Sequence, residues 1–332
     1  MRVYKWRMTK IAAKPNYMLK DGNLINFDDA RLHVLSTSMK YGVGVFEGFR
    51  AYWSADDDEL YAFRVMDHMQ RLVESMRVVE IDGPTDVREL RSQLLELVRV
   101  NDLRQNLLMR VQVFVDSPDG KPEDTGPATV IMAAIPMEGY FARDGLDVQV
   151  SSWSRISERS MPPRVKSIAN YQNGRLAMLE ARRNGFDAAL IPTADGRISE
   201  GAGYNVFMVR HGRLCTPPGT ESILEGITRD SLIHLAHHAL GIEVDQRPID
   251  RTELYSADEL FVCGSAAEVT HVSSVDRRKI SNGRPGPLTE QLQILYQQAV
   301  RNQVATDQGW AEAVYGTPPA GDEAVDFLVG TE

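Results

Sequence analysis

The segment "PRVKSIANYQNGRLAMLEARRNGFDAALI", residues Pro163 to Ile191, joins the clearest structural pattern in the chain to one residue that the pattern does not explain. Its second half predicts a helix over 171–184, a C-cap glycine at Gly185 and a buried strand over 188–191. Lys166 precedes this helix, outside any amphipathic pattern. A loop lysine is usually solvated, so Lys166 is either a surface residue or a chemical one.

Strand and helix patterns alternate through the rest of the chain. Asp21-Gly22 lies between two apolar stretches, which predicts a hairpin. Apolar residues at helical spacing predict helices around Met69 to Met76, over 227–240 and over 287–302. We expect a two-domain α/β (α+β) fold, with a small N-terminal domain over 1–136, an interdomain loop over 137–147, a larger C-terminal domain over 148–314, and a loosely ordered tail over 315–332.

Composition narrows the possible functions. The chain has 332 residues and a formal net charge of −9, which argues against nucleic acid or an anionic membrane as its main partner. No apolar run approaches the roughly 18 residues that a membrane helix needs. The basic N-terminus lacks the apolar core of a secretory signal. Two cysteines, Cys215 and Cys263, form no disulfide framework, and we expect a cytoplasmic protein.

Three side chains could supply nucleophile and acid–base chemistry. A partly desolvated lysine such as Lys166 can form a Schiff base with a carbonyl compound. Tyr171, at the start of the following helix, could hydrogen-bond an oxygen of the same ligand. Glu200 stands in "GRISEGAGYNVF", where glycines permit close approach of the backbone to a ligand. Each residue alone is equally well explained by helix packing or a surface turn.

Two turns and one arginine could bind anions. "LEGITRD" places Ile227 and Thr228 at a helix start, and "CGSAAEVT" places Ser265 in a small-residue turn after a strand. Arg71 could contact a phosphate through both of its terminal nitrogens. The plainer explanations are a helix cap, a tight connection and a solvated charge. His234 and His238 lie four apart without further ligands at metal spacing, so we expect no metal site.

Taken together, these groups fit one cofactor. A lysine, a phenol, a carboxylate and two anion-binding turns are what an aldehyde with a phosphate and a basic ring nitrogen would require. Pyridoxal 5′-phosphate (PLP) has all three features, and it is held through a lysine Schiff base with an acidic partner for its ring nitrogen.

The ordered motifs of the chain resemble those of the fold-type IV PLP-dependent aminotransferases, and most closely the branched-chain amino acid aminotransferases. The resemblance covers about residues 16–305. Its motifs are "YGVGVFEGFR", "RVMDHMQRL", "LLMRVQVF", "SSWSR", "KSIANY", "ISEGAGYNVF", "ILEGITRD" and "CGSAAEVT". It implies two domains with the cofactor between them, and a homodimer or larger assembly.

The resemblance also implies roles for individual residues. Lys166 would form the Schiff base and move the α-proton, Glu200 would pair with the ring nitrogen, and Tyr171 would bind the phenolic oxygen. The phosphate would be held by Arg71, Ile227, Thr228 and Ser265, with Leu224 against the ring. The substrate would be bound by Tyr41, Phe46, Gly48, Arg50, Arg110, Tyr140, Ser265, Ala266 and Ala267, with Arg110 meeting the distal carboxylate of glutamate or 2-oxoglutarate.

The implied reaction is amino transfer between a hydrophobic L-amino acid and 2-oxoglutarate. Leu108 stands where bacterial relatives often have a tyrosine, and Tyr204 stands where a smaller or acidic residue is commoner, so the substrate could instead be an amino acid from a specialised pathway. A D-amino acid aminotransferase or an aminodeoxychorismate lyase would have the same fold and use the same lysine and glutamate. A cofactor-free Schiff-base aldolase and a non-catalytic binding protein are hypotheses from different classes.

Overall fold

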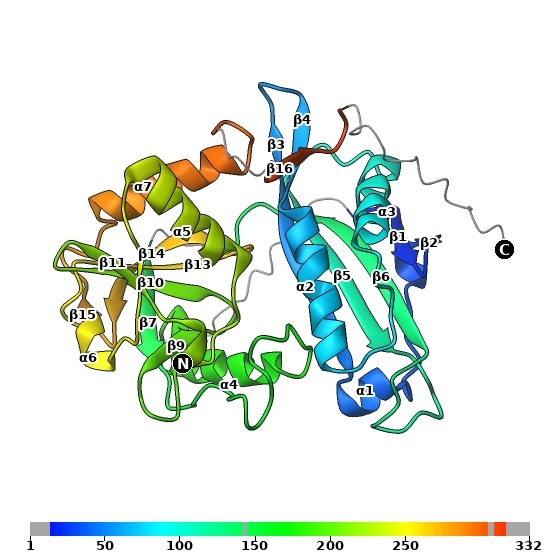
Figure 1. The fold of residues 1–332 in the computed structure, drawn as a ribbon, viewed down its shortest axis with the longest axis horizontal. Coiled ribbons are helices and arrows are strands. Elements are labelled where there is room, and N and C mark those ends of the chain that lie inside the picture. The colour runs from blue at the N-terminus through cyan, green and yellow to red at the C-terminus, as the bar shows by residue number, and fades with distance from the viewer. Residues whose placement is uncertain (1–13, 142–144, 305–308, 317–332) are drawn as a thin grey trace.

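The structure is a computed structural model that describes residues 14–141, 145–304 and 309–316. Over these residues the chain forms two β-sheets with helices packed against them, and the two resulting lobes lie side by side (Figure 1). This arrangement confirms the expected two-domain fold.

The N-terminal lobe is an antiparallel sheet flanked by helices. Its seven described strands follow the order β16-β4-β3-β5-β6-β1-β2, and every neighbouring pair is antiparallel. The strands are β1 (Tyr17–Lys20), β2 (Asn23–Asn26), β3 (Gly44–Ser54), β4 (Glu59–Phe63), β5 (Leu107–Val115), β6 (Ala128–Pro136) and β16 (Ala311–Ala313), and the helices are η1 (Phe27–Asp29), α1 (Thr37–Tyr41), α2 (Val65–Val78) and α3 (Val87–Val100).

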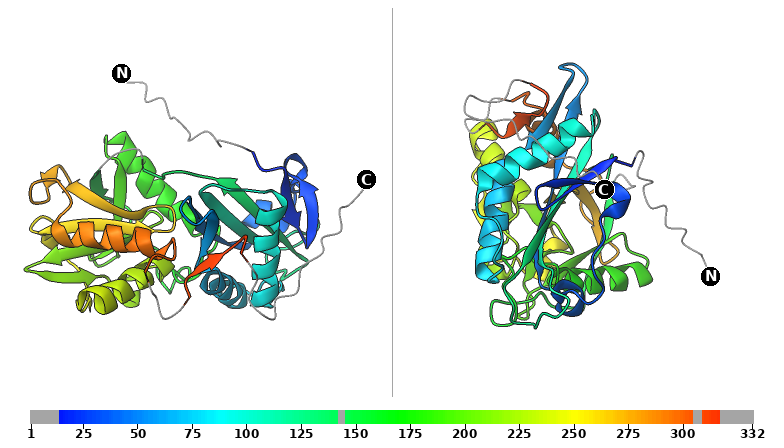
Figure 2. Two further views of the ribbon diagram at one scale, coloured as in Figure 1. Left: turned by 90° about the horizontal axis from the view of Figure 1, so that it is seen from above. Right: turned by 90° about the vertical axis from the view of Figure 1, so that its right-hand side faces the viewer.

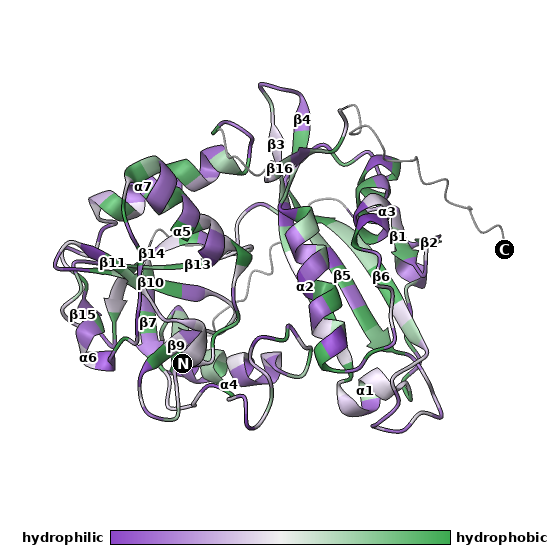
Figure 3. Ribbon diagram, in the orientation of Figure 1, coloured by the Kyte–Doolittle hydropathy of each residue, from purple (hydrophilic) through white to green (hydrophobic). Residues whose placement is uncertain are grey.

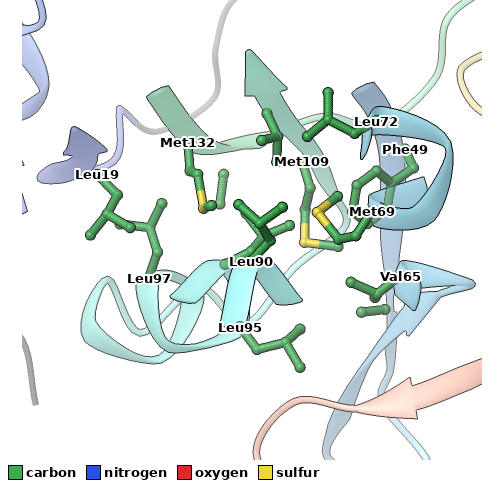
Figure 4. Packing of buried hydrophobic residues seen from close by; sticks show 14 of the residues in the cluster. Leu19, Phe49, Val65, Met69, Leu72, Leu90, Leu95, Leu97, Met109 and Met132 are labelled. Atoms are coloured by element: carbon green, nitrogen blue, oxygen red, sulfur yellow. The ribbon is translucent and has the colours of Figure 1, made fainter. Parts of the chain in front are cut away.

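Apolar packing between this sheet and α2 and α3 forms the N-terminal core. Met69 and Leu72 of α2 meet Phe49 of β3 and Met109 of β5, and all four are at most 1% exposed (Figure 4). The predicted hairpin is confirmed at β1 and β2, where the turn residue Gly22 has φ +78°. Positive φ suits glycine because it has no Cβ.

The C-terminal lobe contains the second sheet, which is mixed. Its strands follow the order β12-β11-β10-β13-β14-β7-β8-β9, with β15 added beside β14. Helices α5 and α7 pack on its β13 side and α4 packs on β8. The elements are β7 (Leu146–Val150), α4 (Tyr171–Arg183), β8 (Ala188–Pro192), β9 (Ile198–Gly201), β10 (Asn205–Arg210), β11 (Arg213–Thr216), η2 (Gly219–Glu221), α5 (Ile227–Leu240), β12 (Asp245–Gln246), α6 (Arg251–Leu254), β13 (Glu259–Gly264), β14 (Glu268–Val275), β15 (Arg278–Lys279) and α7 (Pro287–Ala299).

Hydropathy follows this architecture. Green, apolar residues run along β6 and β10, whereas green and purple residues alternate along α2 and α7, whose inner faces pack on the sheets (Figure 3). No described helix combines the length and the hydropathy that a membrane span requires.

The chain returns to the N-terminal lobe at its end, which differs from the expected domain boundaries. We expected 148–314 to form the C-terminal domain, but β16 pairs with β4, and Arg99 Nε donates to the Val314 carbonyl at 2.7 Å. Figure 2 shows β16, in orange-red, against the N-terminal lobe. Strand β7 begins at Leu146, two residues before the expected start of the C-terminal domain. Of the expected tail, 317–332 lies outside the described residues.

Tyr204 binds the backbone of β8 just beyond the point where its pairing with β9 ends. The last pair of the β8–β9 ladder joins Leu190 to Gly201, so the next residue of β8, Ala189, has no partner in β9. The Tyr204 hydroxyl donates to the Ala189 carbonyl at 3.0 Å and accepts from the Ala189 N–H at 3.1 Å. Its ring lies against Gly201, where a Cβ would come within 1.8 Å of it. One side chain therefore substitutes for a missing strand.

Replacing Tyr204 with Phe should destabilise the fold. Two fully buried backbone groups lose their partner, and each such loss costs about 1–3 kcal/mol, so we expect a drop of about 2–6 kcal/mol in the free energy of unfolding. Urea denaturation measures this drop, and the m value should not change.

The matched control is Tyr255→Phe. The Tyr255 hydroxyl accepts from Arg251 at 2.7 Å and donates to Asp276 at 2.8 Å, in a partly exposed position where water can replace it. Equal losses in the two variants would contradict the strand-replacement role of Tyr204.

Candidate active site

Lys166 lies at the boundary between the two lobes. Its carbonyl accepts a hydrogen bond from Phe46 N–H of β3 at 3.0 Å, and two residues later Ile168 N–H donates to the Gly44 carbonyl at 2.9 Å. These bonds form a short antiparallel bridge between the lysine loop and β3. The backbone of Lys166 is thereby fixed to the N-terminal sheet, while its side chain extends along the start of α4.

The Lys166 amine faces a phenol. Its Nζ lies 2.7 Å from the Tyr171 hydroxyl, and Tyr171 is the first residue of α4. Phe46 packs edge-on against the Tyr171 ring, with 4.7 Å between ring centroids. No carboxylate among the described residues forms an ion pair with Lys166, so its amine is available to a ligand.

Glu200 provides a buried carboxylate in the same pocket. Its Oε2 accepts from Leu224 N–H at 3.0 Å and from Asn205 Nδ2 at 3.1 Å, and its Oε1 pairs with Arg155 Nη2 at 2.7 Å. Burial raises the pKa of Glu200, and the charge of Arg155 opposes that rise. Since each carboxylate oxygen can accept two hydrogen bonds, Oε1 retains room for one further donor.

Arg155 is a site residue that the sequence analysis missed. Its guanidinium also donates to the Ser222 carbonyl at 3.2 Å and to Asn173 Oδ1 at 3.3 Å, which fixes its position beneath Glu200. The signal was present, because Arg155 ends the motif "SSWSR". Sequence alone offered no reason to pair it with a glutamate 45 residues away.

The start of α5, beside Arg71, has the features of an anion site. Helix α5 has Gly226 as its N-cap with no side-chain cap, so the first backbone N–H groups are open to the pocket. The simpler explanation, that Thr228 caps this helix, is wrong, because Thr228 lies inside it. Arg71 Nη1 donates to the Glu225 carbonyl at 3.0 Å, which brings the α2 guanidinium to the beginning of α5.

These groups line one pocket of about 630 Å³, including its mouth. The pocket brings together every residue predicted to hold the cofactor, namely Arg71, Lys166, Tyr171, Glu200, Leu224, Ile227, Thr228 and Ser265.

Part of the predicted substrate set lies next to the pocket. The Arg110 guanidinium stacks 3.9 Å from the centre of the Phe46 ring, and Gly48 is its partner in the β3–β5 register. A Cβ on Gly48 would lie 3.5 Å from Arg110 Nη1. No described acid forms an ion pair with Arg110. Ser265 lines the pocket, and Ala266 and Ala267 complete the turn between β13 and β14.

The remaining predicted substrate residues are placed differently. Arg50 is buried and already bound, pairing with Glu268 at 2.8 Å and donating to the Met137 carbonyl at 2.7 Å. Tyr41 and Tyr140 are 50% and 54% exposed and do not line the pocket in the single chain.

Comparisons with known proteins agree with this geometry. The model of the amino-transferase class IV family matches residues 44–275. The branched-chain-amino-acid aminotransferase of Escherichia coli K12 is 38% identical over 307 residues, covering 91% of this chain and 98% of that protein.

Solved structures are similar over the same extent. The branched-chain aminotransferase of Thermoproteus uzoniensis, solved with norvaline, has a TM-score of 0.87 at 38% identity and covers 91% of this chain and 100% of its own. The branched-chain amino acid aminotransferase of Thermobaculum terrenum, solved in its PLP-form, has a TM-score of 0.85 at 38% identity, with coverages of 90% and 98%. With a family model matching well over half of its length, this chain belongs to the class IV aminotransferases.

Proposed function

We propose that the protein is a PLP-dependent aminotransferase that moves the amino group of a hydrophobic, branched-chain L-amino acid to 2-oxoglutarate, giving a 2-oxo acid and L-glutamate. The observation that carries the proposal is the pocket itself. It holds an amine beside a phenol, a buried carboxylate with one open acceptor position, and an uncapped helix start beside an arginine.

The residues present fit the cofactor. The phosphate suits the start of α5 with Arg71, the ring nitrogen suits Glu200, and the aldehyde suits Lys166 beside Tyr171. Gly226 supports the fit, because a Cβ there would lie 2.0 Å from Asn205 Oδ1 and disturb the group that holds Glu200. PLP supplies an aldehyde that captures the substrate amine and a protonated ring that withdraws electrons from its Cα.

The side chains of the protein then have distinct tasks. Lys166, once its amine is free, would take the proton from the substrate Cα as general base and deliver it as general acid to the former aldehyde carbon of the cofactor. Tyr171 donates to the phenolic oxygen of the cofactor. Glu200 accepts from the ring N–H and keeps that proton in place, and Arg155 keeps Glu200 ionised in its buried position.

The substrate carboxylate and side chain occupy different parts of the site in this proposal. The turn at Ser265–Ala267 receives the carboxylate through its backbone N–H groups. Phe46 and Tyr171 give an aromatic wall that suits an aliphatic side chain. Arg110, which has no ionic partner among the described residues, meets the distal carboxylate of 2-oxoglutarate.

We also propose that the enzyme is a cytoplasmic homodimer or larger homo-oligomer. Both cysteines are free and buried, which suits a reducing compartment. Val34, Leu35, Met39 and Tyr41 are 50–71% exposed around α1. Gly42, which ends α1, lies against Ala169 of the lysine loop. A second copy covering this apolar segment would bring Tyr41 into the assembled site.

Competing functions fit the site less well. A cofactor-free aldolase leaves the anion site at α5 and Arg71 without a purpose. A D-amino acid aminotransferase or an aminodeoxychorismate lyase would use the same Lys166 and Glu200, but the three relatives described above are branched-chain enzymes. Turnover of L-leucine compared with D-alanine separates these possibilities.

The visible spectrum of the purified protein tests the function. We expect a yellow band that L-leucine bleaches and 2-oxoglutarate restores, whereas D-alanine leaves it unchanged.

Lys166→Ala should lose the borohydride-reducible cofactor linkage and at least about 10³-fold in turnover, because it removes both the covalent anchor and the general base. A protein that remains colourless after PLP is supplied would contradict the proposal, as would a Lys166→Ala variant that keeps the linkage.

Arg110→Met should affect the two half-reactions unequally. Loss of a charge-assisted hydrogen bond to a carboxylate is worth about 1.5–3 kcal/mol, so the KM for 2-oxoglutarate should rise by about 10–100-fold. The reaction with L-leucine should stay within about threefold of wild type, since leucine has no distal carboxylate to meet Arg110. Single-turnover kinetics with each substrate provide the comparison, and equal losses in both would disprove this role of Arg110.

Arg155→Met should move the pH dependence of the reaction. Burial already raises the pKa of Glu200, and removing the positive charge of Arg155 raises that pKa further. Glu200 works as a carboxylate, so activity is lost as pH falls through its pKa. We therefore expect the acidic limb of the kcat/KM profile to shift to higher pH.

Arg197→Met serves as the control for this shift. Arg197 forms a comparable bond to another buried glutamate, Glu221, at 2.9 Å, but neither residue lines the pocket. Its profile should match that of the wild type, and an unshifted Arg155→Met profile would refute the role given to Arg155.

A further inference from the structure

Arg71 is held by a buried acid rather than left free to find its ligand. Glu47 of β3 is fully buried, and it binds Arg71 through two parallel bonds, Nε to Oε1 at 2.7 Å and Nη2 to Oε2 at 2.8 Å. A two-bond contact of this kind fixes the plane of the guanidinium. Nη1 is the guanidinium nitrogen that makes no bond to Glu47, and it donates to the Glu225 carbonyl at the start of α5.

His68 holds the acid in turn. Its Nδ1 lies 2.7 Å from Glu47 Oε2, and its ring stacks on Phe49 with 4.3 Å between centroids and 12° between planes. Burial lowers the pKa of His68 to about 4, so the ring is neutral. Burial would raise the pKa of Glu47, but the charge of Arg71 and the hydrogen bonds from Arg71 and His68 outweigh burial and lower that pKa. A neutral imidazole facing a carboxylate must donate its proton from Nδ1.

This arrangement has an electrostatic consequence. With His68 neutral, the charges of Glu47 and Arg71 cancel, so Glu47 weakens the attraction between Arg71 and an anion in the pocket. The same acid prevents the long arginine side chain from rotating away. If Glu47 is replaced by a neutral residue, the change in charge predicts tighter binding of the phosphate. The loss of orientation predicts weaker binding.

We propose that Glu47 is a positioning residue that presents Arg71 Nη1 to the phosphate of the cofactor, and that orientation outweighs the loss of net charge. The inference rests on the proposed function, which places the phosphate at Arg71 and α5. Glutamine at position 47 offers one acceptor oxygen and a nitrogen that cannot accept from Arg71. Glu47→Gln therefore removes one of the two bonds and frees the guanidinium plane.

The test compares cofactor release with and without a phosphate. Holoenzyme is loaded with PLP or with pyridoxal, which lacks the phosphate, and loss of the yellow band is followed after dilution into a trapping reagent. For Glu47→Gln, we expect PLP release to be about tenfold faster, as the weakening of one charge-assisted contact implies, with pyridoxal release unchanged.

Glu259→Gln is the matched control. Glu259 is another buried glutamate with a structural task, accepting from Thr289 N–H and Thr289 Oγ1 at 2.7 Å each at the start of α7. This substitution should lower thermal stability without altering the ratio of PLP to pyridoxal release. If Glu47→Gln fails to fold, His68→Phe, which removes the donor to Glu47, should show a smaller change in the same ratio.

Several results would overturn the inference. Equal acceleration for PLP and pyridoxal would show that Glu47 acts only through general stability. Slower release of PLP would show that charge outweighs orientation. If the wild-type protein binds PLP and Glu47→Gln leaves the ratio of PLP to pyridoxal release unchanged, the inference is refuted but the proposed function is not. If the wild-type protein never forms a yellow band, the proposed function is refuted.

Discussion

The pocket depends on the short bridge between β3 and the lysine loop. Two backbone hydrogen bonds, from Phe46 to Lys166 and from Ile168 to Gly44, connect the N-terminal sheet to the segment that leads into α4. Backbone bonds fix a position more firmly than contacts between long side chains, which lose conformational entropy when they are held. The lysine amine can therefore be mobile at its tip while its Cα is fixed at the lobe boundary.

Buried ion pairs assemble both ends of the pocket. Glu47 with Arg71 lies at the end proposed for the phosphate, and Glu200 with Arg155 lies at the end proposed for the ring nitrogen. The balance of forces differs between the two. At Glu47 two hydrogen-bonded partners outweigh burial and lower the pKa, whereas at Glu200 burial outweighs its partners and raises the pKa. Burial of a charge is expensive without partners, so neither acid could be retained without its arginine.

Contacts between the two lobes fix the two ends of the pocket relative to each other. Arg64, at the N-cap of α2, donates to the Ile227 carbonyl at 3.3 Å and pairs with Asp230 at 2.6 Å in the first turn of α5. Helix α2 also carries Arg71, so this one helix places Arg71 at the start of α5 and binds α5 through Arg64. Strand β16 adds a second connection between the lobes, because it returns the chain to the N-terminal sheet and pairs with β4.

Local pattern was enough to predict most of the fold and the identity of the chemical groups. The helical period before Gly185, the hairpin at Asp21-Gly22 and the ordered motifs around Lys166 and Glu200 are properties of neighbouring residues, and neighbours determine helix caps, turns and amphipathic faces. Only the tertiary structure decided which distant residues became partners. Arg155 with Glu200, Glu47 with Arg71 and β16 with β4 are contacts between separate elements, whose side chains carry no local mark of the partner. Such pairings arise when the elements of each lobe pack together, because burial then requires every charge and backbone group to find a partner.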